Sequence, residues 1–157
     1  MEKHSLGIVA EADLPELLVL LRAYCDFYRV TPADESLLAL SRALIADPSH
    51  EGVQLIAREE SDPQRAAVGF ATVFWSWSTT KAMRVGVMHD LFVAPGARGQ
   101  GLAEALIAAC VERCAEHGAG ALQWDTALDN VRAQKVYDRV GGRRSRWLSY
   151  ELQVPPS

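Results

Sequence analysis

The sequence contains few cysteines, and none of them stands in a pattern typical of structural cysteines. Three occur among 157 residues, namely Cys25, Cys110 and Cys114. The odd number, the lack of Cys-x-x-Cys spacing and the lack of a neighbouring histidine cluster argue against a disulfide framework and a zinc site. We therefore expect reduced thiols and no metal centre, with Cys110 and Cys114 in the core.

Long apolar runs and an excess of positive charge are also missing. No uninterrupted apolar stretch approaches the roughly 18 residues of a membrane span, and the first residues carry charges where a signal peptide needs an apolar stretch. Sixteen Lys and Arg against twenty Asp and Glu give a formal net charge of -4, so no general basic field is available for nucleic acid or an anionic membrane. We expect a cytoplasmic protein that binds neither.

The remaining composition is that of an ordinary globular protein. Hydrophobic residues make up 49% and charged residues 23% of the chain, which disfavours disorder. A length of 157 residues matches the prior of roughly 150 residues for one domain. No repeat or low-complexity segment interrupts the chain, so we predict a single domain over residues 1–157.

Apolar periodicity predicts the element order β-α-α-β-β-β-α-β-α-β. The predicted strands span residues 5–10, 53–58, 66–77, 83–93, 121–126 and about 146–153, and the predicted helices span residues 13–28, about 37–47, 99–117 and 129–140. Asp13 with Glu16, and Asp129, are the predicted helix starts. The consecutive strands predict hairpins, and the later strand-helix-strand segment predicts a crossover. The fold class is therefore α+β, with a mixed, mostly antiparallel sheet and helices on both faces.

The most informative segment, Leu-Phe-Val-Ala-Pro-Gly-Ala-Arg-Gly-Gln-Gly-Leu-Ala over residues 91–103, leads from a strand through a glycine-containing turn into a helix. Backbone N–H groups at a helix start lack intrahelical partners and lie at the positive end of the helix dipole. Glycines let a phosphate approach the chain closely. The segment therefore predicts an anion site suited to a pyrophosphate, while a tight turn without a ligand remains an alternative.

Two other nucleotide sites compete for this loop. A P-loop is excluded because no Gly-Lys-Ser/Thr follows. A dinucleotide fingerprint needs a small residue where Glu104 stands, although Asp125 lies roughly where the ribose-binding acid is expected. Only about one further crossover follows the loop, where two mononucleotide-binding halves are needed. A nucleotide-dependent oxidoreductase stays open as the weaker alternative.

The loop and a second motif together resemble the GNAT superfamily, the GCN5-related N-acetyltransferases that transfer an acyl group from coenzyme A. Arg-Gly-Gln-Gly-Leu-Ala at residues 98–103 matches the family's Arg/Gln-x-x-Gly-x-Gly/Ala loop. Downstream, Asn130, Ala133, Tyr137 and Gly141 match the pattern Asn-x-x-Ala-x-x-x-Tyr-x-x-x-Gly of the last helix. The predicted element order also agrees with the GNAT fold, so the resemblance extends over nearly the whole chain.

The resemblance implies acetyl-CoA as the cofactor and assigns most of its contacts to the main chain. The residues implied to hold the pyrophosphate are Arg98, Gly99, Gln100, Gly101, Leu102 and Ala103. The pantetheine arm is implied to pair like a strand with Leu91, Phe92 and Val93, where this strand and the strand at residues 121–126 splay apart. Asn130 is implied to hydrogen-bond the arm, and a main-chain N–H near Val93 to stabilise the oxyanion.

Acyl transfer to an amine also needs groups that handle protons. His89 and Asp90 are the nearest candidates, and adjacent strand residues point to opposite faces unless a bulge intervenes. We expect Asp90 to bind the cationic amine and His89 to act as the base, because an imidazole ordinarily titrates near neutrality. His-Asp-Leu-Phe-Val at residues 89–93 resembles the Glu-Asp-Phe-Phe-Val segment of diamine acetyltransferases, with His89 in place of the Glu assigned as base. A surface His89 and a structural Asp90 remain the alternative.

Tyr137 is implied by the same resemblance to be the acid that protonates the CoA thiolate. A phenol and a thiol have reference pKa values of about 10 and 8.5, close enough for proton transfer. The alternative is a core tyrosine on the apolar face of its helix.

Aromatic residues are candidates for the acceptor side. Tyr24, Phe27 and Tyr28 end the first predicted helix, while Trp75 and Trp77 share one face of a strand. An aromatic wall beside Asp90 suits a primary amine through cation–π attraction and ion pairing, although the same residues also suit a core.

The function hypothesis is an acetyl-CoA-dependent N-acetyltransferase. Its acceptor is a primary amine of a small molecule, polyamine-like or an amino-sugar, or an amine of a protein, and the amine attacks directly in a ternary complex. The alternative is a catalytically degenerate GNAT domain that binds CoA as a sensor or interaction module. Because dimers are frequent in the superfamily, the resemblance also suggests a homodimer.

Overall fold

A computed structural model describes residues 2–157. The chain forms two compact units, one ending at Asp125 and one spanning Thr126–Ser157, and the single domain stays a prediction. Within the described residues, no helix has both the length and the apolar character that crossing a membrane requires. The same residues contain no group of three His, Cys, Asp or Glu side chains placed to hold a metal ion.

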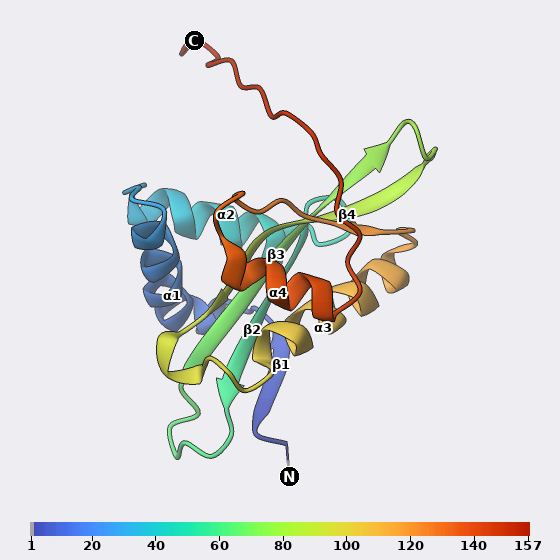
Figure 1. The fold of residues 1–157 in the computed structure, drawn as a ribbon. Coiled ribbons are helices and arrows are strands. Elements are labelled where there is room, and N and C mark those ends of the chain that lie inside the picture. The colour runs from blue at the N-terminus through green and yellow to red at the C-terminus, as the bar shows by residue number, and fades with distance from the viewer. Residues whose placement is uncertain (1) are drawn as a thin grey trace. The chain divides into compact units, whose positions relative to one another are not determined.

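The first unit is built on a five-stranded sheet in the order β1-β2-β3-β4-β5 (Figure 1). The strands are β1 (His4–Ile8), β2 (Gly52–Glu59), β3 (Ala67–Ser78), β4 (Met83–Val93) and β5 (Leu122–Gln123). The first four pair antiparallel, and β5 pairs parallel with β4. The predicted mixed, mostly antiparallel sheet is confirmed, but the strand predicted over residues 121–126 has only two paired residues.

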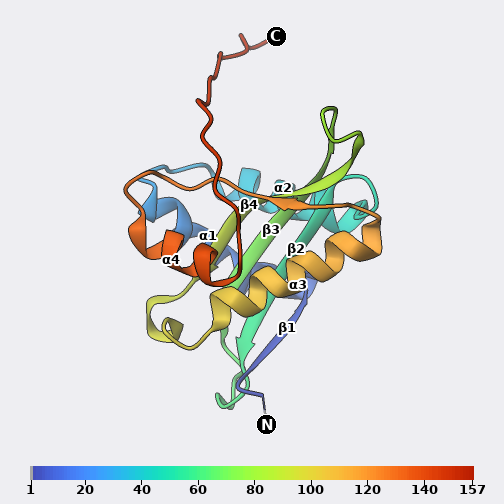
Figure 2. The ribbon, with the colours of Figure 1, turned by 45° about the vertical axis from the view of Figure 1, so that its right-hand side comes forward.

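Helices cover both faces of this sheet, as predicted. The helices of the unit are α1 (Leu14–Phe27), α2 (Asp34–Ala46) and α3 (Leu102–His117). A Cβ at Gly69 of β3 would lie 3.4 Å from Leu106 of α3, whereas the next residue, Phe70, packs among the apolar side chains of α1. Because successive strand residues point to opposite faces, α3 covers one face, and α1 covers the other together with α2 (Figure 2).

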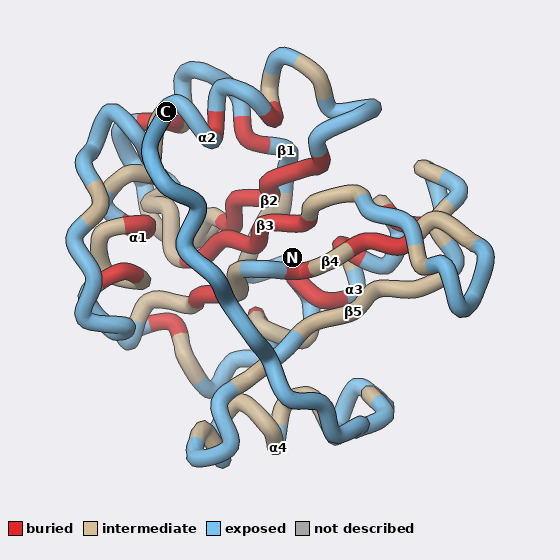
Figure 3. Tube along the Cα trace, turned by 90° about the horizontal axis from the view of Figure 1, so that it is seen from above, coloured by how far each residue is buried: buried red, intermediate tan, exposed pale blue. Residues whose placement is uncertain are grey.

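The core forms where the apolar stripe of α1 meets the sheet. Leu14, Leu17 and Leu21 recur at helical spacing and pack with Phe70 and Phe92. Leu17 is fully buried, and burial of such a side chain contributes about 1.5–3 kcal/mol. Buried stretches follow α1 and the central strands in Figure 3. All three cysteines are free and buried, which confirms the prediction for Cys110 and Cys114.

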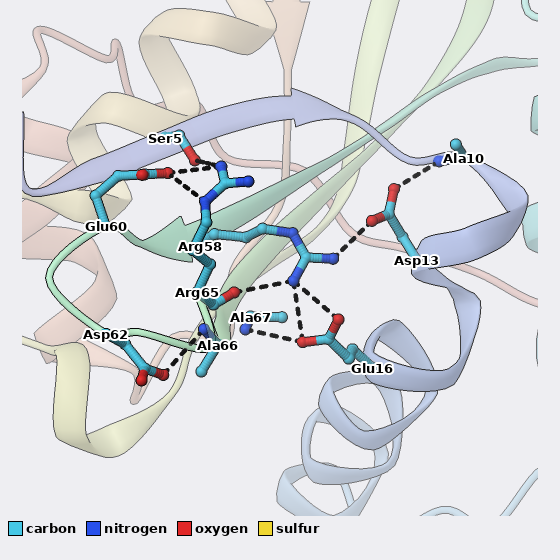
Figure 4. Close-up of polar contacts among 10 residues, drawn as sticks. All are labelled: Ser5, Ala10, Asp13, Glu16, Arg58, Glu60, Asp62, Arg65, Ala66 and Ala67. Atoms are coloured by element: carbon cyan, nitrogen blue, oxygen red, sulfur yellow. Dashed lines mark hydrogen bonds and ion pairs between the residues drawn. The ribbon is translucent and has the colours of Figure 1, made fainter.

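The start of α1 is held by ion pairs with the sheet (Figure 4). Arg58 of β2 donates to Asp13 at 2.6 Å and to Glu16 at 2.9 Å. The carboxylate of Asp13 also accepts the Ala10 N–H at 2.8 Å. The predicted helix start is confirmed, since α1 begins directly after Asp13, although no side-chain hydrogen bond caps it. Asp13 and Glu16 also connect the helix to β2, because the Arg58 guanidinium donates charge-assisted hydrogen bonds to both carboxylates.

The second unit contains α4 (Val131–Arg139). Asn130, rather than the predicted Asp129, caps this helix, since its side-chain oxygen accepts the Ala133 N–H at 3.3 Å. Gly141 ends the helix at a φ of 85°, the left-handed conformation that glycine adopts without strain.

The final predicted strand was wrong. Residues 143–157 contain neither helix nor strand. Their sequence alternates as a strand requires, but a strand forms only where a neighbouring strand accepts its backbone hydrogen bonds.

Candidate functional site

The edge of β4 that faces β5 is open along half of its length. β5 pairs with β4 only at Gly86 and Val87. Among the described residues, no strand pairs with Met88–Val93 on that side. The end of pairing after Val87 is compatible with the separation of the two strands that the resemblance implied.

Main-chain groups on this edge can be assigned from the hydrogen bonds on the other side. The Ala94 N–H donates to the Val68 carbonyl at 2.8 Å, so Ala94 faces β3. Because alternate strand residues direct their N–H and C=O groups to the same side, Leu91 and Val93 face the open edge. The Val93 carbonyl accepts Nε–H of Arg98 at 3.0 Å. The N–H and C=O groups of Leu91 and the N–H group of Val93 therefore remain available to form hydrogen bonds with a ligand.

The loop after β4 has the geometry of an anion site. It passes through a short 3-10 helix, Pro95–Ala97, and reaches α3 with Gly99 and Gly101 at φ angles of 77° and 79°. The Ala105 N–H donates to the Gly101 carbonyl at 3.1 Å. The amides of Leu102 and Ala103 precede this bond and have no carbonyl four residues earlier within the helix. They lie at the positive end of the dipole of α3.

Side chains of the same loop anchor it. Leu102 is buried and lies against the Gly69 position of β3. The Arg98 guanidinium lies 6.0 Å from the centre of the Phe92 ring, whose side chain is in the core. Leu102 and Phe92 thus fix the backbone that a phosphate and a pantetheine arm would contact. These main-chain groups fit the cofactor that the sequence implied.

A β-bulge occurs in β4 at His89. Thr72 of β3 is paired with Asp90 and the next residue, Val73, with Met88, so His89 is the extra residue. A bulge places two successive side chains on one face. The His89 ring lies 5.1 Å from that of Phe74, and Asp90 contacts Thr72 and Tyr24. Both predicted proton-handling residues therefore lie on the face covered by α1.

Asp90 belongs to a row of polar residues across three strands. Gln54, Thr72 and Asp90 are register partners, and Nε2–H of Gln54 donates to Oγ1 of Thr72 at 3.1 Å. The Tyr24 hydroxyl donates to the His89 carbonyl at 3.1 Å, which ties α1 to the bulge. Gln54 and Thr72 were missed at the sequence level. Their signal was a polar residue inside the apolar stretch of each of two strands.

Burial dominates the titration of this cluster. It raises the pKa of the Asp90 carboxyl above its ordinary value, although hydrogen bonds from Thr72 and Tyr24 and the nearby His89 act in the opposite direction. Burial, and then the charge of Asp90, raises the pKa of the Tyr24 phenol. A half-buried carboxylate whose charged form is disfavoured by burial is stabilised by a cationic partner.

The predicted aromatic residues divide between the two faces. Tyr24 contacts Tyr28 with ring centres 5.0 Å apart, and Tyr28 contacts Phe27 at 5.1 Å. Phe27 and Tyr28 are exposed. The end of α1 therefore does place an accessible aromatic cluster next to the residues around Asp90.

Trp75 and Trp77 do not join that cluster. Trp75 stacks on His117 at the end of α3, with ring centres 4.0 Å apart, and Trp77 lies under the Arg84 guanidinium. They share a face, as predicted, but it is the α3 face, opposite to Asp90. Their proposed place in one wall with Asp90 was wrong, because the α1 face of β3 is occupied by the even-numbered residues Phe70 and Thr72.

Asn130 and Tyr137 belong to the second unit. They are seven residues apart, two helical turns, so they share one face of α4. The side-chain oxygen of Asn130 is engaged in the cap, which leaves its amide N–H groups for a ligand.

A cavity of about 230 Å³ near β1 does not compete as an active site. Its two arginines are saturated, since Arg58 binds Asp13 and Glu16, and Arg65 donates to Glu60 at 2.7 Å and to Ser5 at 3.1 Å (Figure 4). We assign this cluster to holding β1, β2 and α1 together.

Comparison with known proteins agrees with this geometry. The chain matches the Acetyltransferase (GNAT) family over residues 17–142. It therefore belongs to this family and is an acetyltransferase that uses acetyl-CoA as the acyl donor.

Individual relatives are distant. An uncharacterized N-acetyltransferase of Bacillus subtilis, YhfO, is 28% identical over 92% of this chain and 93% of its own. The crystal structure of a probable acetyltransferase has a TM-score of 0.75 at 25% identity and covers 98% of this chain and 99% of its own. AAC(6')-Iy, solved with the bisubstrate analogue CoA-S-monomethyl-acetylneamine, has a TM-score of 0.82 at 21% identity and covers 98% and 100%.

Proposed function

We propose that this protein transfers the acetyl group of acetyl-CoA to a primary amine of a small molecule, polyamine-like or an amino-sugar. The observation that carries the proposal is the half-buried Asp90 carboxyl, which lies within the open stretch of β4 and next to the aromatic end of α1. A cationic amine held by Asp90 and Tyr24 lies close to the edge along which the cofactor arm would run. The acetylneamine analogue bound by AAC(6')-Iy agrees with such an acceptor.

The acyl donor would be held mainly by the backbone. The amides of residues 98–103 would bind the pyrophosphate, and Leu91 and Val93 would pair with the pantetheine arm. The Val93 N–H is then the donor for the tetrahedral oxyanion, and a preorganised donor of this kind contributes roughly 10²- to 10³-fold in rate. Acetyl-CoA supplies the activated thioester, and Asn130 would hydrogen-bond its arm.

Direct attack by the amine is favoured over an acyl-enzyme. The free cysteines are buried, and burial raises the pKa of the Cys110 thiol to about 12 and raises those of Cys25 and Cys114. Such thiols carry little thiolate at neutral pH and make poor nucleophiles. A ternary complex therefore suits the described residues, with His89 as the base and Tyr137 as the acid.

A panel of amines with acetyl-CoA tests the function through release of free thiol. We expect turnover with cationic primary amines, and a larger loss of kcat/KM for Asp90→Asn than for the exposed control Asp26→Asn. CoA binding without thiol release from any amine would instead favour the sensor alternative. Turnover confined to a protein amine would contradict the small-molecule acceptor.

Tyr137→Phe tests the acid. It removes one phenolic oxygen and keeps the ring, so kcat should fall about 10²-fold or more while KM changes little. Equal kcat in both proteins would assign Tyr137 to packing. Cytoplasmic location and the homodimer remain predictions.

A further inference from the structure

Gln54, Thr72 and Asp90 form a row across β2, β3 and β4, which we call the polar row. Thr72 is fully buried and Gln54 is 3% exposed. In β2, Gln54 stands between Val53 and Leu55, which are buried as well. Polar side chains destabilise such positions unless their hydrogen bonds are satisfied. Packing alone therefore does not account for Gln54 and Thr72.

The hydrogen bonds of the polar row run in one direction, toward Asp90. Nε2–H of Gln54 donates to Oγ1 of Thr72 at 3.1 Å, and Thr72 is hydrogen-bonded to the Asp90 carboxyl. A hydroxyl has one proton to donate, and a carboxylate can only accept. Because Oγ1 of Thr72 accepts from Gln54, its own proton is available for Asp90. Each donor in such a chain strengthens the next hydrogen bond.

The other donor to Asp90, Tyr24, is shared with the main chain. Its hydroxyl donates to the His89 carbonyl at 3.1 Å, and a phenol also has only one proton. Of the two hydroxyls that contact Asp90, the one on Thr72 is therefore the donor that does not also hold the β-bulge.

Gln54 occupies its position at a cost to folding. Its Oε1 atom is buried and has no hydrogen-bond partner among the described residues. An unpaired buried acceptor lowers the free energy of unfolding. A leucine at this position would avoid that loss, so the amide serves the polar row rather than the core.

The β-bulge brings Asp90 into the polar row. Val73 pairs with Met88, and continuing this register would place His89 opposite Thr72. The extra residue places Asp90 there instead. Side chains directly opposite each other on neighbouring strands lie close enough to interact.

We propose that Thr72 and Gln54 are positioning residues for the acceptor amine, which act by holding the Asp90 carboxylate in place and in its charged form. The inference rests on the proposed binding of a cationic amine by Asp90. Neither residue needs to touch the amine, because Thr72 acts on the carboxylate and Gln54 acts on Thr72.

The charge of Asp90 depends on a small set of neighbours. Burial raises the pKa of its carboxyl, and the hydrogen bond from Thr72 acts against this. The titratable groups that interact with Asp90 are His89 on its own strand and Tyr24 and Cys25 on α1. Loss of the Thr72 hydroxyl should therefore favour the neutral acid, which attracts an ammonium group less.

Titration of the Asp90 carboxyl by carbon-13 NMR, with its signal assigned through Asp90→Asn, tests the proposal without an activity assay. Thr72→Val removes the hydroxyl and nearly keeps the shape, so the titration should move to higher pH by about one pH unit. Thr72→Ser keeps a hydroxyl and should restore the parent titration. Thr79→Val, in the exposed turn between β3 and β4, is the matched control and should change nothing. An unmoved titration in Thr72→Val would overturn the proposal.

Kinetics with a cationic primary amine give the second test. On the acidic side of the pH profile, Thr72→Val should raise KM for the amine about ten-fold and leave KM for acetyl-CoA close to that of the parent. Gln54→Leu should show a smaller rise without a lower melting temperature. A rise in KM for both substrates together with a lower melting temperature would mean a structural role and overturn the proposal. Parent-like kinetics of Asp90→Asn, with the titration shift present, would overturn the proposed amine site instead.

Discussion

Gly101 stands where the β4 loop enters α3, and two separate properties of this residue matter for the cofactor. Its φ of 79° lies in the left-handed region, and a Cβ there would meet no atom within 4 Å. Backbone conformation, rather than crowding by the chain itself, is therefore what favours glycine.

Two substitutions of Gly101 separate strain from charge. Both Gly101→Ala and Gly101→Glu add the left-handed cost of about 1–2 kcal/mol, but only Glu puts a negative charge beside the amides that would bind the pyrophosphate. We expect calorimetry to show weakened CoA binding by Gly101→Ala and no CoA binding by Gly101→Glu. Equal CoA affinity in Gly101→Glu and the parent would remove the loop from the cofactor site.

We expect the Asp90 carboxyl to lower the stability of the folded protein while it serves the proposed binding of the amine. The pKa of this carboxyl is raised in the folded state, so the folded protein favours the neutral acid, and the free energy of unfolding falls as the pH rises from the ordinary Asp value through the folded-state pKa. Asp90→Asn should therefore melt higher than the parent at pH 7–8. The difference should shrink as the pH falls toward the ordinary Asp value of about 3.9.

Melting curves across this pH range measure the difference in melting temperature between Asp90→Asn and the parent. The exposed Asp26→Asn is the control. A lower melting temperature for Asp90→Asn at neutral pH would mean that Thr72 and Tyr24 stabilise the carboxylate by more than burial costs it.

Among the elements, α3 and β4 show how closely the layers approach. A Cβ at Gly86 would lie 2.6 Å from Sγ of Cys114, 3.0 Å from Cγ1 of Val73 and 3.2 Å from Cζ3 of Trp75. Because these atoms belong to a packed layer, Gly86→Ala should lower the free energy of unfolding by about 1–3 kcal/mol.

Gly7→Ala in β1 is the matched control for that experiment. A Cβ at Gly7 has no atom within 4 Å, so the change should stay within about 0.5 kcal/mol. Urea unfolding measures both variants. Equal stabilities would mean that α3 moves away from β4 at little cost.

Element order was predictable from the sequence because periodicity is local. Leu14, Leu17 and Leu21 mark a helix, and the bounds of β4 were predicted to the residue. The failures involve partners distant in sequence. The ion pair between Asp13 and Arg58 was not predicted, and residues 146–153 lack the neighbouring strand that would make them a strand.

At the scale of the whole molecule, acetyl-CoA should stabilise the folded protein. A ligand at 100 times its dissociation constant adds about 2.7 kcal/mol to the free energy of unfolding, which raises the melting temperature of a chain of this size by roughly 5–10 °C. NAD at the same concentration should have no effect. A shift with NAD and none with acetyl-CoA would restore the dinucleotide alternative.

The candidate site was predictable in part. Residues 98–103 and His89 with Asp90 could be proposed from the sequence, because a glycine loop and charged residues beside an apolar strand are visible in the order of residues alone. Gln54 and Thr72 were not, since their relation to Asp90 depends on the pairing of three strands. Trp75 was assigned to the wrong face, because alternation tells which residues share a face but not which helix covers it.

The sequence by itself determined the order of elements up to the last helix, the glycine loop after β4 and the family, because each depends on short-range spacing that can be read without coordinates. Only the tertiary structure decided that a bulge turns His89 and Asp90 to the same face and that burial raises the pKa of the Asp90 carboxyl. It also decided that the three cysteines are buried and that the β4 edge after Val87 has no strand partner among the described residues. The reason is physical. Strand register, burial and face depend on contacts between residues far apart in the chain, and no local pattern specifies them.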